Sequence, residues 1–175
     1  ARSYFERGLV RLRLGDVDRA VIDMNAALAK RPAAVFYNGR GSAWLEKGEP
    51  EKAIADHTAA MRGDPKLSAG YKNRGIAREA QGEYLTAITD YNLALKLNPS
   101  SARAYTNRAR SWKKLGKYDR AAEDYTRACQ LNPNWPLAFN NRAEVRNRMG
   151  QYDKAIEDCN RALKLDPRST WALTN

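Results

Sequence analysis

The sequence predicts an all-α protein, a solenoid built from antiparallel helix pairs. Three residue markers recur along the 175 residues with a spacing of 33 or 34, which is typical of stacked helical repeats. Glycine takes the first marker position, at Gly15, Gly48, Gly82, Gly116 and Gly150. Proline and alanine keep the same separations, at Pro32, Pro65, Pro99, Pro133 and Pro167 and at Ala20, Ala53, Ala87, Ala121 and Ala155. Agreement among three independent markers excludes chance similarity.

Each repeat is expected to hold two helices around a glycine turn. In the last full repeat, the first helix has a stripe at i, i+3, i+4 and i+7, formed by Phe139, Arg142, Ala143 and Arg146. Gly150 then allows a tight turn because it lacks a Cβ atom. The inner face of the second helix carries Ala155, Cys159, Ala162 and Leu163. Pro167 ends that helix, since proline disfavours helical backbone in the residue before it.

The markers divide the chain into five full repeats. We expect a single array over residues 1–175, with repeats at 1–33, 34–67, 68–101, 102–135 and 136–169 and the start of a sixth at 170–175. Such arrays usually end in a helix with a polar outer face, and no such helix follows the fifth repeat. We therefore expect a fragment of a longer protein, with end-to-end self-association as the alternative.

This pattern resembles the tetratricopeptide repeat (TPR) family. Its 34-residue unit places an aromatic residue, a small residue, alanine, a second aromatic residue and proline at set offsets. The resemblance covers the whole chain, and the fourth repeat illustrates it with the segments 105–109, 115–118 and 131–133. It implies a right-handed superhelix whose first helices line a concave groove. It also implies a scaffold or adaptor that binds proteins, rather than an enzyme.

Composition and charge narrow the function further. The chain has 31 Lys and Arg residues against 20 Asp and Glu residues, a formal net charge of +11, which favours acidic partners. No apolar run is long enough to span a membrane, and no signal peptide opens the chain. His57, Cys129 and Cys159 fit a helical core and give no catalytic set, metal site or cofactor site. We expect a cytoplasmic protein, with the bacterial periplasm as the alternative.

Two sets of charged residues are expected to stabilise the helix pairs. An arginine precedes the small residue of every first helix, at Arg7, Arg40, Arg74, Arg108 and Arg142. An aspartate follows each marker alanine by three residues, at Asp23, Asp56, Asp90, Asp124 and Asp158. At about 100° per residue, both sets flank the same seam between helices, so we predict five Arg–Asp pairs. The alternative is a ladder of five arginines that binds a ligand.

A further position alternates strictly between arginine and tryptophan, in the order Arg11, Trp44, Arg78, Trp112 and Arg146. Neighbouring first helices lie side by side in such arrays. We therefore predict that arginine stacks on tryptophan between repeats, in a packing role. Replacing Trp112 by leucine should then lower thermal stability and leave partner binding unchanged.

The predicted binding surface is the groove along the first helices. The position two residues before the small residue carries Glu6, Gly39, Asn73, Asn107, Asn141 and Asn175. It faces away from the core, and an asparagine amide offers both a donor and an acceptor to a peptide backbone. The row is similar to the asparagine ladder of O-linked N-acetylglucosamine transferase, which implies peptide binding by the four asparagines alone. The alternative is that these asparagines only tolerate solvent.

Basic residues add charge to this surface, above all in the fourth repeat. They are Arg103, Arg110, Lys113 and Lys114, followed by Arg148 in the fifth repeat. Lys72 and Asn107 match part of the clamp by which some relatives bind the C-terminal carboxylate of chaperones, but Ile76 and Leu137 break that clamp. An acidic peptide, or one with a free C-terminal carboxylate, is therefore the predicted partner. The alternative is RNA or another polyanion, bound through the fourth and fifth repeats.

Overall fold

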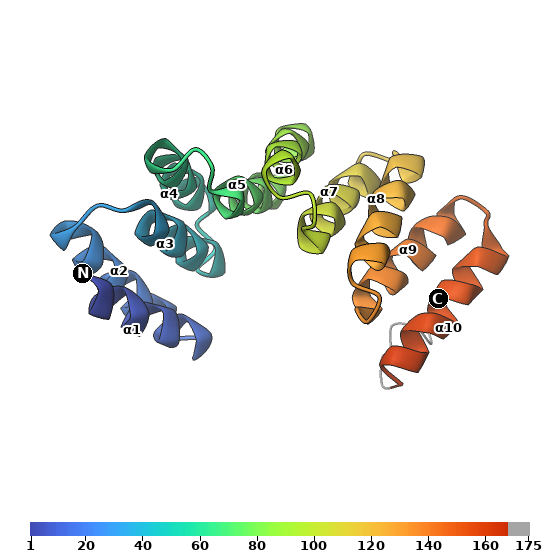
Figure 1. The fold of residues 1–175 in the computed structure, drawn as a ribbon, viewed down its shortest axis with the longest axis horizontal. Coiled ribbons are helices and arrows are strands. Elements are labelled where there is room, and N and C mark those ends of the chain that lie inside the picture. Colours follow the sequence, from blue (N-terminus) through green and yellow to red (C-terminus); the bar gives the residue numbers. More distant parts are fainter. Residues whose placement is uncertain (168–175) are drawn as a thin grey trace. The chain divides into compact units, whose positions relative to one another are not determined.

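The structure is a computed structural model that describes residues 1–167, where all regular secondary structure is helical. The ten helices of these residues are α1 (Arg2–Arg13), α2 (Val17–Lys30), α3 (Ala34–Glu46), α4 (Pro50–Gly63), α5 (Ser68–Ala80), α6 (Tyr84–Leu97), α7 (Ala102–Lys114), α8 (Tyr118–Leu131), α9 (Pro136–Arg148) and α10 (Tyr152–Leu165) (Figure 1). The all-α class and the two helices per repeat are confirmed. The start of the predicted sixth repeat lies outside the described residues. Among the ten helices, none combines the length and the apolar character that a membrane span requires.

A glycine with left-handed backbone closes each helical hairpin. The φ angles are between 70° and 80° at Gly15, Gly48, Gly82, Gly116 and Gly150. An L side chain is strained in this region, so the repeating glycine is a backbone requirement of the turn. In the last hairpin, the N–H of Gln151 donates to the carbonyl oxygen of Arg146 at 2.9 Å and so satisfies one of the last carbonyls of α9.

The chain divides into two compact units. The first unit, Ala1–Leu97, holds α1 to α6 and therefore the first three repeats. The second unit begins at Asn98 and holds α7 to α10, the fourth and fifth repeats. Within the first unit α3 contacts both α1 and α5, so the three first helices lie side by side. The continuous array over residues 1–175 stays a prediction.

Small residues let the two helices of a repeat approach closely. The five marker alanines are buried. The bulky side chains at the centre of the interface are also fully buried, and they are Met24, His57, Tyr91 and Tyr125. Gly41 of α3 faces the His57 ring, and a Cβ atom there would lie 2.7 Å from the ring Cε1 atom. The buried position of His57 therefore depends on the missing side chain of Gly41.

The predicted stacking of arginine on tryptophan between repeats is wrong. Arg11, Arg78 and Arg146 donate instead to the aspartate of their own repeat, at 2.8, 2.9 and 2.8 Å. Trp44 and Trp112 are each covered by a basic side chain from the second helix of their own repeat. The Lys52 ammonium lies 4.8 Å from the centroid of the Trp44 ring, and the Arg120 guanidinium lies 4.7 Å from that of Trp112. A charge-assisted hydrogen bond to a carboxylate is stronger than a contact with an aromatic face, so the arginines stay within their repeats.

Replacing Trp112 by leucine is expected to lower the free energy of unfolding by about 2 kcal/mol, because the change removes packed apolar surface and the contact with Arg120. Trp112 packs against the buried cluster of Ala109, Ala121, Tyr125 and Val145. Urea denaturation followed by circular dichroism measures the effect. The control is Arg120→Ala, which removes only the cation–π contact and should cost less than about 1 kcal/mol. An unchanged midpoint for Trp112→Leu would contradict the packing role.

Candidate functional site

Five arginine–aspartate pairs fix each first helix against its second helix. The Nε and Nη2 atoms of the arginine donate to the two carboxylate oxygens of an aspartate 16 residues later, at 2.6–2.9 Å. The pairs are Arg7–Asp23, Arg40–Asp56, Arg74–Asp90, Arg108–Asp124 and Arg142–Asp158. All five aspartates are buried, and the hydrogen bonds from Arg7 lower the pKa of Asp23. These pairs hold the first helices in a defined orientation.

The same arginines also connect neighbouring repeats. The Nη1 atom of Arg40 donates to Asn25 Oδ1 at 2.7 Å. In the same way Arg74 donates to Thr58 Oγ1 at 3.1 Å, and Arg142 donates to Thr126 Oγ1 at 3.3 Å. In these three arginines each guanidinium nitrogen has an acceptor within the fold. The contacts account for the arginines as structural residues and give no support to a ligand-binding ladder of arginines.

In the first unit, the predicted asparagine row is represented by Asn73. This residue is half-buried on α5, and its Nδ2 atom reaches α3, at 3.3 Å from Asn38 Oδ1 and 3.4 Å from Ser42 Oγ. The preceding residue, Lys72, is half-buried as well. The amide of Asn73 is therefore held by the neighbouring first helix, which restricts the directions in which it can meet a ligand.

The second repeat departs from the asparagine row for a packing reason. Gly39 lies against the ring of Phe5, and a Cβ atom at Gly39 would be 2.4 Å from Phe5 Cε2. Phe5 in turn packs on Phe36, with ring centroids 4.7 Å apart. An asparagine at position 39 would collide with this aromatic pair. The surface here is instead an apolar hollow of about 420 Å³, lined by Phe5, Phe36 and Val35 and bordered by Arg2 and Arg31.

In the second unit, Asn107 and Asn141 are half-buried on α7 and α9. A hollow of about 510 Å³ includes Asn141 together with Trp135, Leu137 and Lys113. The Lys113 ammonium lies 2.7 Å from a carboxylate oxygen of Glu144 on α9. The spacing of residues did not predict this ion pair. The carboxylate of Glu144 lowers the net positive charge that Lys113 contributes to the surface. Asn175, the last asparagine of the row, lies outside the described residues.

The remaining predicted basic residues are exposed. They are Arg103, Arg110 and Lys114 on α7 and Arg148 on α9. Long basic side chains at such positions reach into solvent and contribute to the electrostatic potential around the second unit.

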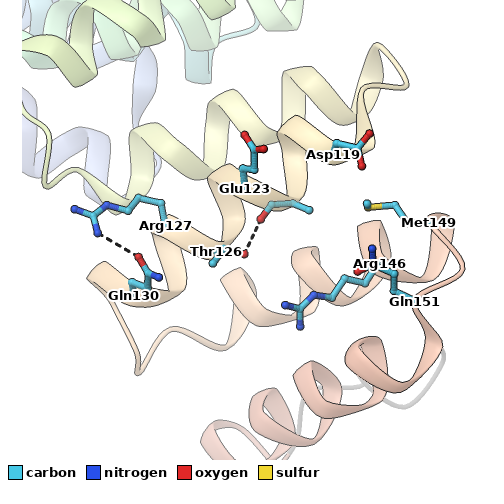
Figure 2. A pocket seen from close by; sticks show the side chains of 9 residues that line it. Asp119, Glu123, Thr126, Arg127, Gln130, Arg146, Met149 and Gln151 are labelled. Atoms are coloured by element: carbon cyan, nitrogen blue, oxygen red, sulfur yellow. Dashed lines mark hydrogen bonds between the residues drawn. The ribbon is translucent and has the colours of Figure 1, made fainter.

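A third hollow, which the sequence did not predict, lies beside α8 (Figure 2). Its volume is about 490 Å³, and its lining includes Asp119, Glu123, Arg146 and Met149. The lining residue Ala122 takes the place that bulkier residues occupy in the other repeats, namely Val21, Ile54, Ile88 and Ile156. The small side chain of Ala122 is the feature of the sequence that distinguishes this position from its equivalents in the other repeats.

Two buried titratable side chains within residues 1–167, Cys129 and His57, have shifted pKa values. Burial raises the pKa of Cys129 to about 11, so its thiol stays protonated at neutral pH. Burial lowers the pKa of His57 to about 4, which keeps its imidazole neutral. Within the same residues, no group of three or more His, Cys, Asp and Glu side chains could hold a metal ion.

Comparison with known sequences relates the chain to a single family. Two models described as tetratricopeptide repeat match residues 5–67 in one case and residues 102–134 and 136–169 in the other. A third model, described as TPR repeat, matches residues 77–114. Together the matches extend over most of the chain. No curated protein matches the sequence.

Solved structures share the fold. The thermophilic TPR protein TTC0263 of Thermus thermophilus has a TM-score of 0.81 at 21% identity, over 98% of this chain and 94% of that chain. YrrB, a TPR protein described as having an unusual peptide-binding site, has a TM-score of 0.75 at 20% identity, over 97% of this chain and 88% of that one. The first TPR of Spaghetti (RPAP3), bound to the HSP90 peptide SRMEEVD, has a TM-score of 0.65 at 29% identity, over 67% and 93%.

Proposed function

Because the chain belongs to the tetratricopeptide repeat family, we propose that it is a protein-interaction scaffold that binds an extended, acidic protein segment along its first helices. The observation that carries this proposal is a half-buried asparagine that recurs at one position of the first helices, at Asn73 in the first unit and at Asn107 and Asn141 in the second. Asparagine is a mediocre helix former, so helix propensity gives little reason to repeat it there. A row of amides can exchange hydrogen bonds with the backbone of an extended peptide, whatever its side chains are.

Charge supports an acidic partner. The whole chain has a formal net charge of +11, and exposed cations border the asparagines of the second unit at Arg103, Arg110, Lys114 and Arg148. Complementary charge mainly speeds encounter and selects among partners, while hydrogen bonds and apolar contacts hold the segment. In the first unit, the apolar hollow at Phe5 and Phe36 would accept an apolar side chain of a bound segment.

The relatives support binding of peptides as a class. The peptide bound to the first TPR of Spaghetti (RPAP3), SRMEEVD, contains three acidic residues among seven. YrrB has a peptide-binding site by its description. This chain lacks the complete clamp expected for a chaperone tail, because Ile76 and Leu137 take positions at which a polar or basic residue is expected. We therefore propose an acidic segment without assigning it to a chaperone.

A pull-down from native lysate tests the proposal. The natural chain is compared with a variant in which Asn73, Asn107 and Asn141 are all changed to alanine, with nuclease present throughout. Each lost hydrogen bond contributes about 1 kcal/mol, so the triple variant should capture its protein partner at least about tenfold less well. Circular dichroism checks that the variant folds. A control with Asn134 and Asn160 changed to alanine, both exposed and outside the row, should bind like the natural chain.

Two outcomes would contradict the proposal. Unchanged capture by the triple variant would show that binding uses another surface, and the asparagines would then be ordinary solvent-facing residues. Loss of capture on adding nuclease alone, with a strong decrease as salt is raised, would favour the polyanion alternative.

A further inference from the structure

The Asn73 amide belongs to a cluster of four polar side chains in the first unit. Asn38 Oδ1 lies 3.0 Å from His57 Nδ1 and 3.3 Å from Asn73 Nδ2. Ser42 Oγ donates to the carbonyl oxygen of Asn38 at 3.2 Å and accepts from Asn73 Nδ2 at 3.4 Å. The cluster connects the core of the second repeat, through α3, to the first helix of the third repeat.

Hydrogen-bond chemistry allows one favourable arrangement of protons in this cluster. If Asn38 Oδ1 accepts from both neighbours, the proton of the neutral His57 ring is on Nδ1 and its Nε2 atom is an acceptor. His57 is fully buried, and Nε2 has no hydrogen-bond partner. The opposite arrangement would turn both amides around and leave an Nε2–H donor buried without a partner. Buried donors without an acceptor are rarer than unsatisfied acceptors, which favours the first arrangement.

The preferred arrangement fixes which atoms the two amides present to solvent. With its oxygen turned inward, Asn38 has its NH₂ group outward, and Asn73 has its carbonyl oxygen outward. Neither of these atoms has a hydrogen-bond partner among the described residues, and neither atom is completely buried. Both therefore reach solvent, one as a donor and the other as an acceptor.

We propose that Asn38 and Asn73 form a donor–acceptor pair that binds the backbone N–H and C=O groups of an extended peptide, with His57 as the positioning residue that sets its polarity. The inference rests on the proposed function and deepens it. A residue in an extended chain presents its N–H and C=O groups on the same edge, so an adjacent acceptor and donor are complementary to it. Asn38 thereby supplies the second repeat with the amide that Gly39 lacks.

The first test needs no ligand. Nitrogen NMR of the chain labelled with ¹⁵N-histidine reports the tautomer directly, because protonated and unprotonated ring nitrogens differ widely in chemical shift. The spectrum contains a single histidine, His57. We expect the proton on Nδ1 between pH 6 and 8. A proton on Nε2 would overturn the inference, since both amides would then be reversed.

The second test uses the tightest binder selected from a random peptide library on the natural chain. Asn38→Ala should weaken its binding by about tenfold, which corresponds to loss of one well-formed hydrogen bond. His57→Met should weaken binding by a similar factor, because methionine fits the equivalent core position at Met24 but cannot orient Asn38. His57→Asn, which retains an N–H donor near the position of Nδ1, should restore most of the affinity. A purely structural role of His57 would not produce this rescue.

A change in the peptide backbone tests the proposed hydrogen bond to Asn73 directly. Methylating the peptide nitrogen that meets Asn73 should weaken binding to the natural chain and have little further effect on the Asn73→Ala variant. If the triple asparagine variant loses the peptide while Asn38→Ala and His57→Met retain it, this inference is overturned and the proposed function stands. If no library peptide binds the natural chain, the proposed function fails as a peptide-binding function and the inference fails with it.

Discussion

Replacing Asp90 by alanine is expected to lower the free energy of unfolding by about 3–5 kcal/mol, the largest loss from any single substitution considered for this chain. Asp90 is fully buried and accepts from two arginines, Arg74 at 2.9 and 2.7 Å and Arg78 at 2.9 Å. The side chains of Arg74 and Arg78 are only 16% and 23% exposed. Without the carboxylate, two mostly buried cations would face each other with no anion between them. Urea denaturation followed by circular dichroism measures the loss.

Two further variants show whether the buried charge causes the loss of stability in Asp90→Ala. Asp90→Asn keeps the side-chain volume but turns an N–H group toward arginine donors, so it should still cost at least about 2 kcal/mol. Asp18→Ala removes an ion pair with Lys47 in which Asp18 is 76% exposed, and it should cost less than about 1 kcal/mol. Equal losses for Asp18→Ala and Asp90→Ala would contradict this account of the seam.

Helical geometry predicts the position of a side chain around its helix, but not which of several partners it binds. The angle between successive residues places Arg74 and Asp90 beside one seam, and this depends only on two helices packing in a known register. Which group the Arg78 guanidinium binds depends on the partners that its long side chain can reach. Angular position could not decide between an aromatic face and Asp90, which already has one arginine. The structure shows that the carboxylate accepts both.

The same limit applies to the candidate site. The outward positions of Asn73, Asn107 and Asn141 follow from helical angles and are half-buried in the structure. The ion pair between Lys113 and Glu144 joins first helices of different repeats, so it depends on the distance between them. The number of residues between repeats in the sequence does not give the distance between their helices in space. For the same reason, the sequence could place His57 in the core but could not link it to the amides of the binding surface.

A second large effect is expected when the pH falls, and it arises from His57. Burial, together with the positive charges of Arg74 and Lys72, lowers the pKa of His57 from its ordinary value of 6.5 to about 4. Between these two values the unfolded chain binds a proton at position 57 and the folded chain does not. The contribution of the neutral histidine to stability is therefore complete above pH 6.5 and is lost as the pH falls toward 4. The loss should reach about 3 kcal/mol, since one pKa unit corresponds to about 1.4 kcal/mol.

His57→Met isolates this contribution, because methionine does not titrate and occupies the equivalent core position at Met24. Free energies of unfolding from urea titrations at pH 7, 6, 5 and 4 should decline more steeply for the natural chain than for the variant, and the difference should grow by about 3 kcal/mol. The carboxylate of Asp23 does not affect this comparison, because both chains contain it and its lowered pKa contributes equally to both pH profiles. Parallel pH profiles for the two chains would mean that His57 takes up a proton as readily in the folded state as in the unfolded state. Below its ordinary pKa of 6.5 the ring would then donate from both nitrogens, and Nε2 could not remain an acceptor beside the oriented amides of Asn38 and Asn73.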